Sequence, residues 1–371
     1  MEVFSKNIAQ LRKKSGLTQQ QLGDKLGVSC QTVSKWECGV TLPDLSLVPA
    51  LCRCFDISAD QLLGIAPLPE GFIPAATGQK QYWEQRLDFL HRTRKYLWND
   101  DYLAFLVQQV WQLNAPVRLL DCGCGFGALG LALLPLLPAG SSYTGVDHAP
   151  ALLAEGRRLF AQQGLTAEFI EADIYEWQPL QQYDVVLCQS VLRHVGDAPA
   201  LVRRMADFAR TGGLVVCIEV DRTIEAAGLY IHGLDRAEVH AACDLTPLWC
   251  TEYRNKNRDW AMGVRLPHLL HEAGLRDIDA RMNDRVTCLL PGTPQHDAVL
   301  ADFLQSHDWG QELGGSDLEA RLHYLTAHGL SRAAAEEHCR RLNDVARHLK
   351  KAGPEAAFTH LHGLFTVWGR K

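Results

Sequence analysis

A glycine-rich turn that follows an apolar segment is the part of this sequence whose residue types are best suited to binding a ligand. Residues 117–120 are apolar and are expected to form a strand, Asp121 ends it, and Gly123, Gly125 and Gly127 lead into a helix. Glycine lets a backbone approach a ligand where a Cβ atom would collide. A single turn of this kind is weak evidence, since dinucleotide-binding enzymes use a similar one. The acid directly before the turn argues against a nicotinamide cofactor.

Polar side chains follow three further apolar segments, each at the point where a strand is expected to end. These residues are Asp147 in SYTGVDHAP, Asp173 in AEFIEADIYEW and Gln189 in QYDVVLCQSV. Ligands of an open α/β sheet bind outside the carboxyl ends of its strands. The order of these residues along the chain therefore predicts one ligand site, with Asp121 as its first member.

The elements that must hold these side chains alternate between apolar strands and amphipathic helices as far as about residue 290. This alternation is typical of βαβ units and a largely parallel sheet, so we expect an α/β fold. Residues 65–80 carry three prolines and two glycines without periodicity and are expected to form a linker. We therefore expect a small all-α domain at 1–64 and a larger domain at 81–371, in which a helical insertion at 292–353 precedes a closing strand.

Over residues 81–290 these motifs resemble the class I S-adenosylmethionine-dependent methyltransferase superfamily, whose members have a Rossmann-like sheet. The resemblance implies S-adenosyl-L-methionine as the cofactor, with Asp147 accepting hydrogen bonds from the ribose and Asp173 accepting one from the adenine amino group. Gln189 would lie beneath the reactive sulfonium. The residues that the resemblance assigns to cofactor binding are Asp121, Gly123, Gly125, Gly127, Asp147, Asp173, Ile174 and Gln189.

Methyl transfer needs little beyond alignment and desolvation of the acceptor, because the sulfonium already carries a good leaving group. A general base is needed only when the acceptor is protonated at neutral pH. His194, just after the fourth expected strand, is the catalytic candidate for that base, and packing at a helix end is the alternative. The segment after this strand reads CQSV instead of N/D-P-P-aromatic, and the chain lacks a Pro-Cys nucleophile. Both observations disfavour DNA as the methyl acceptor and favour a small molecule.

Aromatic residues before the first strand and helices near the C-terminus are the candidates for covering this site. A closer likeness, to bacterial small methyltransferases of unassigned substrate, rests on WNDDYLAFLVQQVWQL and MGVRLPHLLHEAGLRDIDARMNDRV. It makes Tyr82, Trp83 and Trp98 candidate lid aromatics, with packing between a helix and the sheet as the alternative. The charged helices of the insertion would cover the active site or form a dimer surface.

Residues 18–39 have the pattern of two short helices joined by a turn. Thr18 and Ser29 are placed to cap these helices, and Gly27 permits the turn between them. The apolar residues expected on the buried faces are Leu22, Leu26, Val33 and Trp36. The segment is similar to the Cro/C1-type (XRE-like) helix-turn-helix family, and the likeness covers nearly all of residues 4–64.

This second resemblance implies DNA binding by residues 1–64. The residues that it assigns to DNA contact are Arg12, Gln19, Cys30, Gln31 and Lys35, of which the last three would face base edges. Glutamine can form two hydrogen bonds with adenine. Seven basic and six acidic residues give this segment a net charge of only +1, so specific binding would need a homodimer on two half-sites. Use of the same fold for protein interaction is the alternative.

Composition excludes several other classes of protein. Hydrophobic residues make up 47% and charged residues 22% of the chain, as in globular proteins, and the net charge of −6 gives no global attraction to nucleic acid. The first residues lack the apolar core of a signal peptide, and no apolar stretch is long enough to span a membrane. The twelve cysteines have no zinc-ligand spacing. We therefore expect a cytoplasmic protein with reduced thiols and without a metal site or a membrane partner.

Two functions remain open from the sequence. The first is an enzyme that methylates a small molecule and carries a DNA-binding domain that recruits or regulates it. The alternative is a transcriptional regulator whose methyltransferase-like domain senses S-adenosylmethionine or S-adenosylhomocysteine without turnover. Both functions would use the same cofactor-binding residues, and they differ only at the acceptor site, which these motifs leave undefined.

Overall fold

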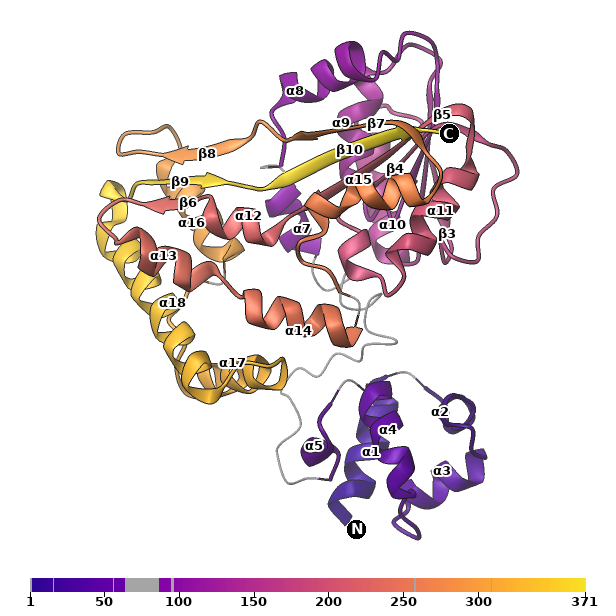
Figure 1. The fold of residues 1–371 in the computed structure, drawn as a ribbon, viewed down its shortest axis with the longest axis vertical. Coiled ribbons are helices and arrows are strands. Elements are labelled where there is room, and N and C mark those ends of the chain that lie inside the picture. The colour runs from indigo at the N-terminus through magenta and orange to yellow at the C-terminus, as the bar shows by residue number, and fades with distance from the viewer. Residues whose placement is uncertain are drawn as a thin grey trace. The chain divides into compact units, whose positions relative to one another are not determined.

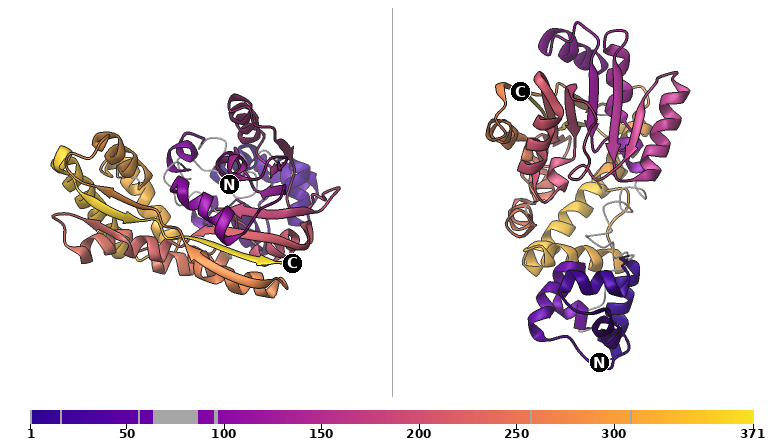
Figure 2. Two further views of the ribbon diagram at one scale, coloured as in Figure 1. Left: turned by 90° about the horizontal axis from the view of Figure 1, so that it is seen from above. Right: turned by 90° about the vertical axis from the view of Figure 1, so that its right-hand side faces the viewer.

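The structure, a computed structural model, describes residues 2–15, 17–55, 57–63, 87–94, 97–256, 258–307 and 309–371. The chain divides into two compact units, residues 1–86 and 87–371, which Figures 1 and 2 draw as ribbons. The expected linker at 65–80 and the lid candidates Tyr82 and Trp83 lie outside the described residues. No helix within the described ranges is both long and apolar enough to cross a bilayer.

The first unit consists of short helices around a small apolar core. Its helices are α1 (Glu2–Lys14), α2 (Gln19–Leu26), α3 (Cys30–Glu37), η1 (Leu45–Leu47), α4 (Val48–Phe55) and α5 (Ala59–Leu63). Phe4, Ile8 and Leu11 recur at helical spacing on α1 and are all buried. They belong to one core cluster with Val33 and Trp36 of α3, which confirms the buried face expected for that helix.

The turn between α2 and α3 is set by hydrogen bonds at both helix starts. Thr18 Oγ1 accepts a hydrogen bond from Gln21 N at 3.1 Å, and Ser29 Oγ accepts one from Thr32 N at 3.2 Å. Gly27 has a φ of +68°, the left-handed conformation that ends α2. The predicted caps and turn are confirmed, and they fix where α2 ends and where α3 begins.

The second unit is built on a seven-stranded sheet with the order β3-β2-β1-β4-β5-β10-β7. Its strands are β1 (Arg118–Cys122), β2 (Ser142–Asp147), β3 (Glu168–Glu171), β4 (Tyr183–Gln189), β5 (Ala209–Val220), β7 (Arg276–Met282) and β10 (Leu364–Arg370). Strands β1 to β5 pair in parallel, whereas β10 is antiparallel to both of its neighbours. The Rossmann-like α/β fold expected from the sequence is confirmed. The strand order reverses between β1 and β4, and ligands bind at such a switch point.

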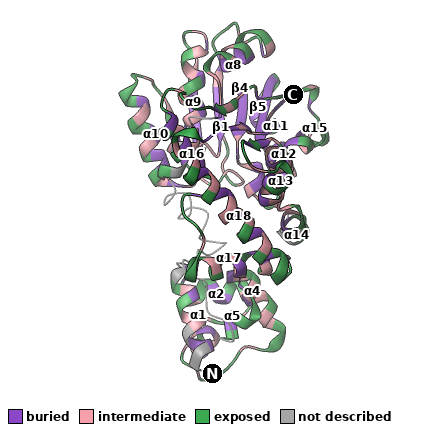
Figure 3. Cartoon of the chain, turned by 90° about the vertical axis from the view of Figure 1, so that its left-hand side faces the viewer, coloured by how far each residue is buried: buried purple, intermediate pink, exposed green. Residues whose placement is uncertain are grey.

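Alternate side chains of the central strands support helices on both faces of this sheet. Leu119 of β1 packs in one apolar cluster with α9 and α10, and the adjacent Leu120 packs in another with α11 and α15. The purple central strands in Figure 3 show this burial. The helices before and between these strands are α7 (Leu87–Arg94), α8 (Asp100–Phe105), η2 (Leu106–Val110), α9 (Ala128–Leu133), η3 (Leu134–Leu136), α10 (Pro150–Gln162), η4 (Leu192–His194), α11 (Ala198–Phe208), α12 (Arg222–Ala227), α13 (Arg236–Cys243), α14 (Thr246–Lys256) and α15 (Met262–Glu272). Because both faces are covered, the central strands β4 and β5 are apolar along most of their length, whereas the edge strand β7 is mostly polar and exposed.

Between β7 and β10 the chain forms a helical region with a small sheet of its own. Its elements are β8 (Val286–Leu289), α16 (His296–Ser306), α17 (Gly315–Ala327), α18 (Arg332–Ala352), η5 (Gly353–Glu355) and β9 (Phe358–Leu361). β9 pairs with β8 and with β6 (Leu229–Ile231) in an antiparallel sheet. Phe303 of α16 stacks on Phe358 of β9 with ring centroids 3.9 Å apart. The insertion at 292–353 stays a prediction, and the three-stranded sheet was not expected from the sequence.

Candidate functional site

The glycine turn between β1 and α9 adopts a backbone that favours glycine. Gly123, Gly125 and Gly127 have φ values of +71°, +56° and +75°, a region that side chains with a Cβ atom rarely adopt. A Cβ atom on Gly123 would also lie 2.7 Å from Cγ2 of Val191. Gly123 N donates a hydrogen bond to Val146 O at 2.8 Å. The turn is thereby held against the end of β2, with its backbone close to the switch point.

Asp121 lies directly beneath this turn and is 2% exposed. Tyr143 Oη donates a hydrogen bond to its Oδ2 at 2.8 Å. Burial raises the pKa of Asp121 to about 7, although the Tyr143 hydrogen bond and the positive charge of Arg94 act in the opposite direction. The site therefore has a carboxyl group that changes charge near neutral pH.

Asp147 ends β2 and ties two backbone segments together. Its Oδ2 accepts a hydrogen bond from Gly125 N at 2.8 Å, and its Oδ1 accepts one from Ala149 N at 2.9 Å. The carboxylate thus fixes the glycine turn against the start of α10. Each carboxylate oxygen can accept a second hydrogen bond, so acceptance from a ribose is compatible with this geometry and stays a prediction.

The third and fourth strand ends differ in how their polar side chains are placed. β3 ends at Glu171, so Asp173 stands two residues beyond the strand, where its Oδ1 accepts a hydrogen bond from Tyr175 N at 2.9 Å. Gln189 is the last residue of β4. Its Nε2 and the Oγ of Ser190 are buried without a hydrogen-bond partner among the described residues. Since buried polar groups are normally paired, these two atoms are available to a ligand.

Strand register determines which of the predicted residues meet. Asp121 pairs in register with Gly145 of β2 and Leu187 of β4, and Asp147 pairs with Glu171 of β3. The negative charge of Asp147 raises the pKa of Asp121, so these two carboxyl groups are close enough to interact. Asp173 and Gln189 follow at the carboxyl ends of the flanking strands. Ile174 is partly buried in the cluster beneath α11 and α15.

His194 lies in η4, in a strongly basic setting. Its Nε2 accepts a hydrogen bond from Arg193 Nε at 3.1 Å. Burial, together with the charges of Arg193 and Arg258, lowers the pKa of His194 well below its ordinary value. The imidazole is therefore neutral at pH 7 and a weak base, and a catalytic role for His194 stays a prediction.

Several charged residues at this edge of the sheet were missed from the sequence. Glu219 of β5 is 0% exposed and accepts hydrogen bonds from Leu192 N at 2.7 Å and from Arg193 Nη1 at 3.0 Å. Arg94, on the helix before β1, has its pKa lowered to about 10 by burial and by Arg193. A glutamate within the otherwise apolar segment of β5 was a usable signal for Glu219. Nothing in its spacing distinguished Arg94 from other helix arginines.

Trp98 packs within the apolar cluster on the α9 side of the sheet. Its ring stacks on Tyr102 of α8 with centroids 6.3 Å apart. Its Nε1 is buried without a partner in the described ranges. The position fits packing between helix and sheet, and a lid function for Trp98 stays a prediction.

In the first unit, the residues assigned to DNA contact fall into two groups. Gln31 and Lys35 are exposed on α3, and Cys30 is partly exposed at its start. Arg12 is instead ion-paired with Glu37, with 2.5 Å between Nε and Oε1, and its side chain is only 12% exposed. Gln19 Nε2 also donates a hydrogen bond to Glu37 Oε2 at 2.9 Å. Phosphate contact by these two residues would compete with bonds inside the domain.

Comparison with known families agrees with this geometry in both units. Residues 119–213 match the model of the methyltransferase domain, and residues 8–62 match that of the helix-turn-helix. One part of the chain is therefore similar to helix-turn-helix domains and another to methyltransferase domains.

Curated relatives match less than half of the chain. A ubiquinone biosynthesis O-methyltransferase of Cereibacter sphaeroides is 28% identical over 179 residues, which are 46% of this chain and 66% of the relative. The enzyme of the same name from Methylobacterium nodulans is 33% identical over 32% of this chain and 47% of its own length. The chain thus spans about half to two thirds of the length of these relatives. Among solved structures, the [4+2]-cyclase SpnF aligns over 79% of this chain and 95% of its own at 16% identity and a TM-score of 0.43.

Proposed function

We propose that residues 87–371 bind S-adenosylmethionine and transfer its methyl group to a small molecule, and that residues 2–63 bind DNA. The observation that carries the first part is the arrangement at the carboxyl ends of β1 to β4. A turn of three left-handed glycines, the carboxyl groups of Asp121 and Asp147, and the Nε2 of Gln189, which has no hydrogen-bond partner among the described residues, share this edge of the sheet.

The residues present fit this cofactor in charge and in hydrogen bonding. S-adenosylmethionine supplies an electrophilic methyl group when it is bound. Asp147 has lone pairs left to accept from ribose hydroxyls, and the exposed Asp173 has the carboxylate needed to accept from an amino group. Gln189 Nε2 and Ser190 Oγ are buried polar atoms that a ligand would satisfy. Glycine at position 123 keeps the space between the turn and Val191 free of a Cβ atom.

The residues around η4 limit which acceptors can react. His194 has a lowered pKa and its Nε2 already accepts from Arg193, so it removes a proton poorly at pH 7. The chain's main contribution is then to align and desolvate the acceptor. Acceptors that lose a proton readily, such as acidic hydroxyls, suit this site best. The segment after β4 reads Gln189-Ser190-Val191 and contains no proline to hold a flipped base, which favours a small molecule over DNA.

Calorimetry and methyl transfer with the full chain test the first part of this proposal. S-adenosylhomocysteine should bind at one molecule per chain, and Asp147→Asn and Asp173→Asn should each weaken binding at least about tenfold. Asp207→Asn, the same change on the exposed face of α11, should leave binding unchanged. Tritiated S-adenosylmethionine should label a compound in a metabolite extract. Binding without any labelled product would favour a sensor of this cofactor over an enzyme.

The helix-turn-helix domain is expected to recognise DNA through α3. Selection from random duplexes with the full chain should enrich a motif with two-fold symmetry, because a monomer with little net positive charge neutralises few phosphates. Gln31→Ala should relax the preference at one base position, and Lys35→Ala should weaken binding. Arg53→Ala, which removes an exposed positive charge from α4, is the matched control. Failure to enrich any sequence would favour protein interaction as the use of this domain.

A further inference from the structure

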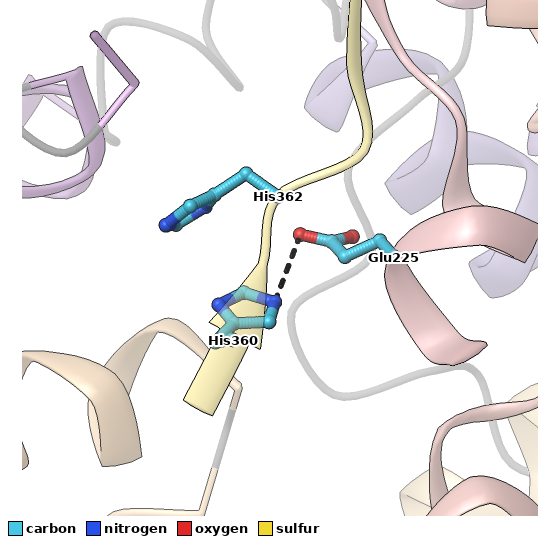
Figure 4. A group of neighbouring side chains, drawn as sticks. All are labelled: Glu225, His360 and His362. Carbon is cyan, nitrogen blue, oxygen red and sulfur yellow. Dashed lines mark ion pairs between the residues drawn. The ribbon is translucent and has the colours of Figure 1, made fainter. Parts of the chain in front are cut away.

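Two histidines and a glutamate converge where β9 leads into β10. Figure 4 shows Glu225 of α12 ion-paired with His360, and His362 nearby on the same connection. One ligand atom of each side chain lies within 4.8 Å of those of the other two. His360 Nε2 is 3.7 Å from Glu225 Oε1, and His360 is 3% exposed. Glu225 is distant in sequence from the two histidines, and none of the three was singled out from the sequence.

The backbone around this group lets α12 and the β9–β10 connection approach each other closely. Asp221 caps α12 by accepting hydrogen bonds from Thr223 N at 3.1 Å and from Ile224 N at 3.3 Å. Gly363, with a φ of +60°, lies so near α12 that a Cβ atom would stand 2.9 Å from Asp221 O and 3.0 Å from Glu225 N. Asp221 N in turn donates to Gly363 O at 2.9 Å. Glycine at 363 thus lets the β9–β10 connection carry both histidines to Glu225.

The three side chains differ in whether a neighbouring residue orients them. The Nε2 atom of His360 is buried and has no hydrogen-bond partner within the described part of the chain. His362 Nε2 lies 3.0 Å from Thr287 Oγ1, which orients the ring and leaves its Nδ1 free of that bond. Arg222 is ion-paired with Glu225 Oε2, so Oε1 is the oxygen that faces His360. In metal sites the ligands are commonly held by hydrogen bonds of this kind.

We propose that Glu225, His360 and His362 bind a divalent transition-metal ion, with Zn²⁺ as its simplest occupant. Two imidazoles and one carboxylate are ligands that Zn²⁺ prefers, and sites with three protein ligands keep a fourth position for water or substrate. At Zn–N distances of about 2.0–2.1 Å, ligand atoms of a tetrahedral site stand about 3.4 Å apart. The present separation of up to 4.8 Å is therefore closed by small side-chain rotations.

Charges around the group are consistent with a cation of moderate affinity. Arg222 is paired with Glu225, and Arg285 donates to Asn99 Oδ1 at 2.7 Å. His307 also lies beside His360, with ring centroids 5.0 Å apart. Arg285 is thus engaged by Asn99, whereas Arg222 would share Glu225 with a bound cation.

The position of this metal site relates it to the edge of the main sheet. Leu364, at the start of β10, pairs with Val220 at the carboxyl end of β5, and Gln189 of β4 pairs with Ile218 of the same strand. The group therefore lies beyond the carboxyl end of β5, at the same edge of the sheet as Gln189. Metal binding itself does not depend on methyl transfer, so its test is separate from that of the proposed function.

Metal titration of the full chain tests the proposal. After removal of metals with a chelator, Zn²⁺ alone is titrated by calorimetry, and Co²⁺ alone is followed by its visible absorption. One ion per chain should bind, and the cobalt spectrum should lack the thiolate charge-transfer band that any of the twelve cysteines would produce. His362→Gln and Glu225→Gln should each weaken binding at least about 100-fold, and Thr287→Val should weaken it about 10-fold to 100-fold.

A matched control separates this site from adventitious binding by histidine. His268→Gln alters an exposed histidine on α15 and should leave the affinity unchanged. Thr287→Val changes no ligand and little volume, so it also tests the site if Glu225→Gln impairs folding. Absence of binding, binding with a thiolate band, or equal affinity in His362→Gln and the wild-type chain would each overturn the proposal.

Discussion

Glu37 in the first unit and Asp121 in the second are both withdrawn from water, but their surroundings differ in kind. Glu37 receives hydrogen bonds from Arg12 and Gln19. Although burial opposes them, these bonds lower the pKa of Glu37. Asp121 receives one hydrogen bond, from Tyr143, and burial raises its pKa to about 7.

This difference in surroundings distinguishes a carboxylate with a structural role from one that can interact with a ligand. A buried charge that is paired within the fold holds neighbouring elements together, and removal of one partner leaves the other uncompensated. A buried carboxyl group without such a partner costs stability when it ionises, and this cost is tolerated mainly at functional sites. Glu37 fits the first description and Asp121 the second, and both assignments can be tested.

The largest effect is expected in the pH dependence of Asp121. Because its pKa in the folded chain is about 7 and about 3.9 when unfolded, the stability it contributes is fully present below about pH 4 and is lost as the pH rises through about 7. The loss can reach about 4 kcal/mol, from roughly three pKa units at 1.36 kcal/mol each. The free energy of opening of β1, measured by hydrogen exchange, should therefore fall over this range relative to that of Asp121→Asn. Parallel pH profiles for the two chains would show that Asp121 titrates normally.

Loss of the Glu37 carboxylate should produce the next largest effect. Glu37→Gln leaves the Arg12 guanidinium, 12% exposed, without its charged partner, which should destabilise the first unit by about 3 kcal/mol. Hydrogen exchange of α1 to α3 in the full chain measures this change. Asp60→Asn, an exposed carboxylate on α5, should change exchange by no more than about 0.5 kcal/mol. If Glu37→Gln and Asp60→Asn had equal effects, Glu37 would have no structural role.

Removal of the hydrogen bond that Tyr143 donates to Asp121 should have a smaller effect. Tyr143→Phe removes the hydrogen-bond donor that lowers the pKa of Asp121. The fall in stability should therefore extend to higher pH, and the free energy of opening of β1 should change by about 1 kcal/mol. The measurement is the same exchange profile of β1. Tyr230→Phe alters a tyrosine that is 48% exposed and should not shift the profile. If the Tyr143 and Tyr230 variants behave alike, another donor must be holding Asp121.

The smallest effect distinguishes neighbouring glutamines on α2. Gln19→Ala removes the hydrogen bond to Glu37 Oε2 and should destabilise the first unit by about 1 kcal/mol. Gln20 bonds only the exposed Asp24, with 2.7 Å between Nε2 and Oδ1, so Gln20→Ala should cost a few tenths of a kcal/mol. Both substitutions have the same helix propensity, and hydrogen exchange of α3 compares them directly. A larger cost at Gln20 would contradict the assigned role of Glu37.

Features that depend on short segments could be predicted from the sequence. The caps at Thr18 and Ser29 and the turn at Gly27 follow from residue type alone. The glycine turn after Asp121 and the succession of strands along the chain follow from local patterns as well, since apolar runs and glycines mark where strands end. These patterns were enough to identify both domains and the strand ends that carry the candidate cofactor site.

Features that depend on contacts between distant segments could not be predicted. The strand β6 belongs to a small sheet whose other strands follow it by more than fifty residues along the chain, so no local period reveals it. Glu225 and His360 meet only because Gly363 lets β10 approach α12. The pairing of Arg12 with Glu37 likewise joins two helices. In each case the contact is determined by the packing of distant segments and not by spacing along the chain.

The most direct test of the central claim is a crystal structure of the full chain with S-adenosylhomocysteine. The proposal predicts density for one ligand at the carboxyl ends of β1 to β4, with its ribose at Asp147 and its adenine beside Asp173. Crystals grown with ligand in excess of its measured dissociation constant would contradict the proposal if this edge of the sheet held no density or if the ligand bound elsewhere on the chain.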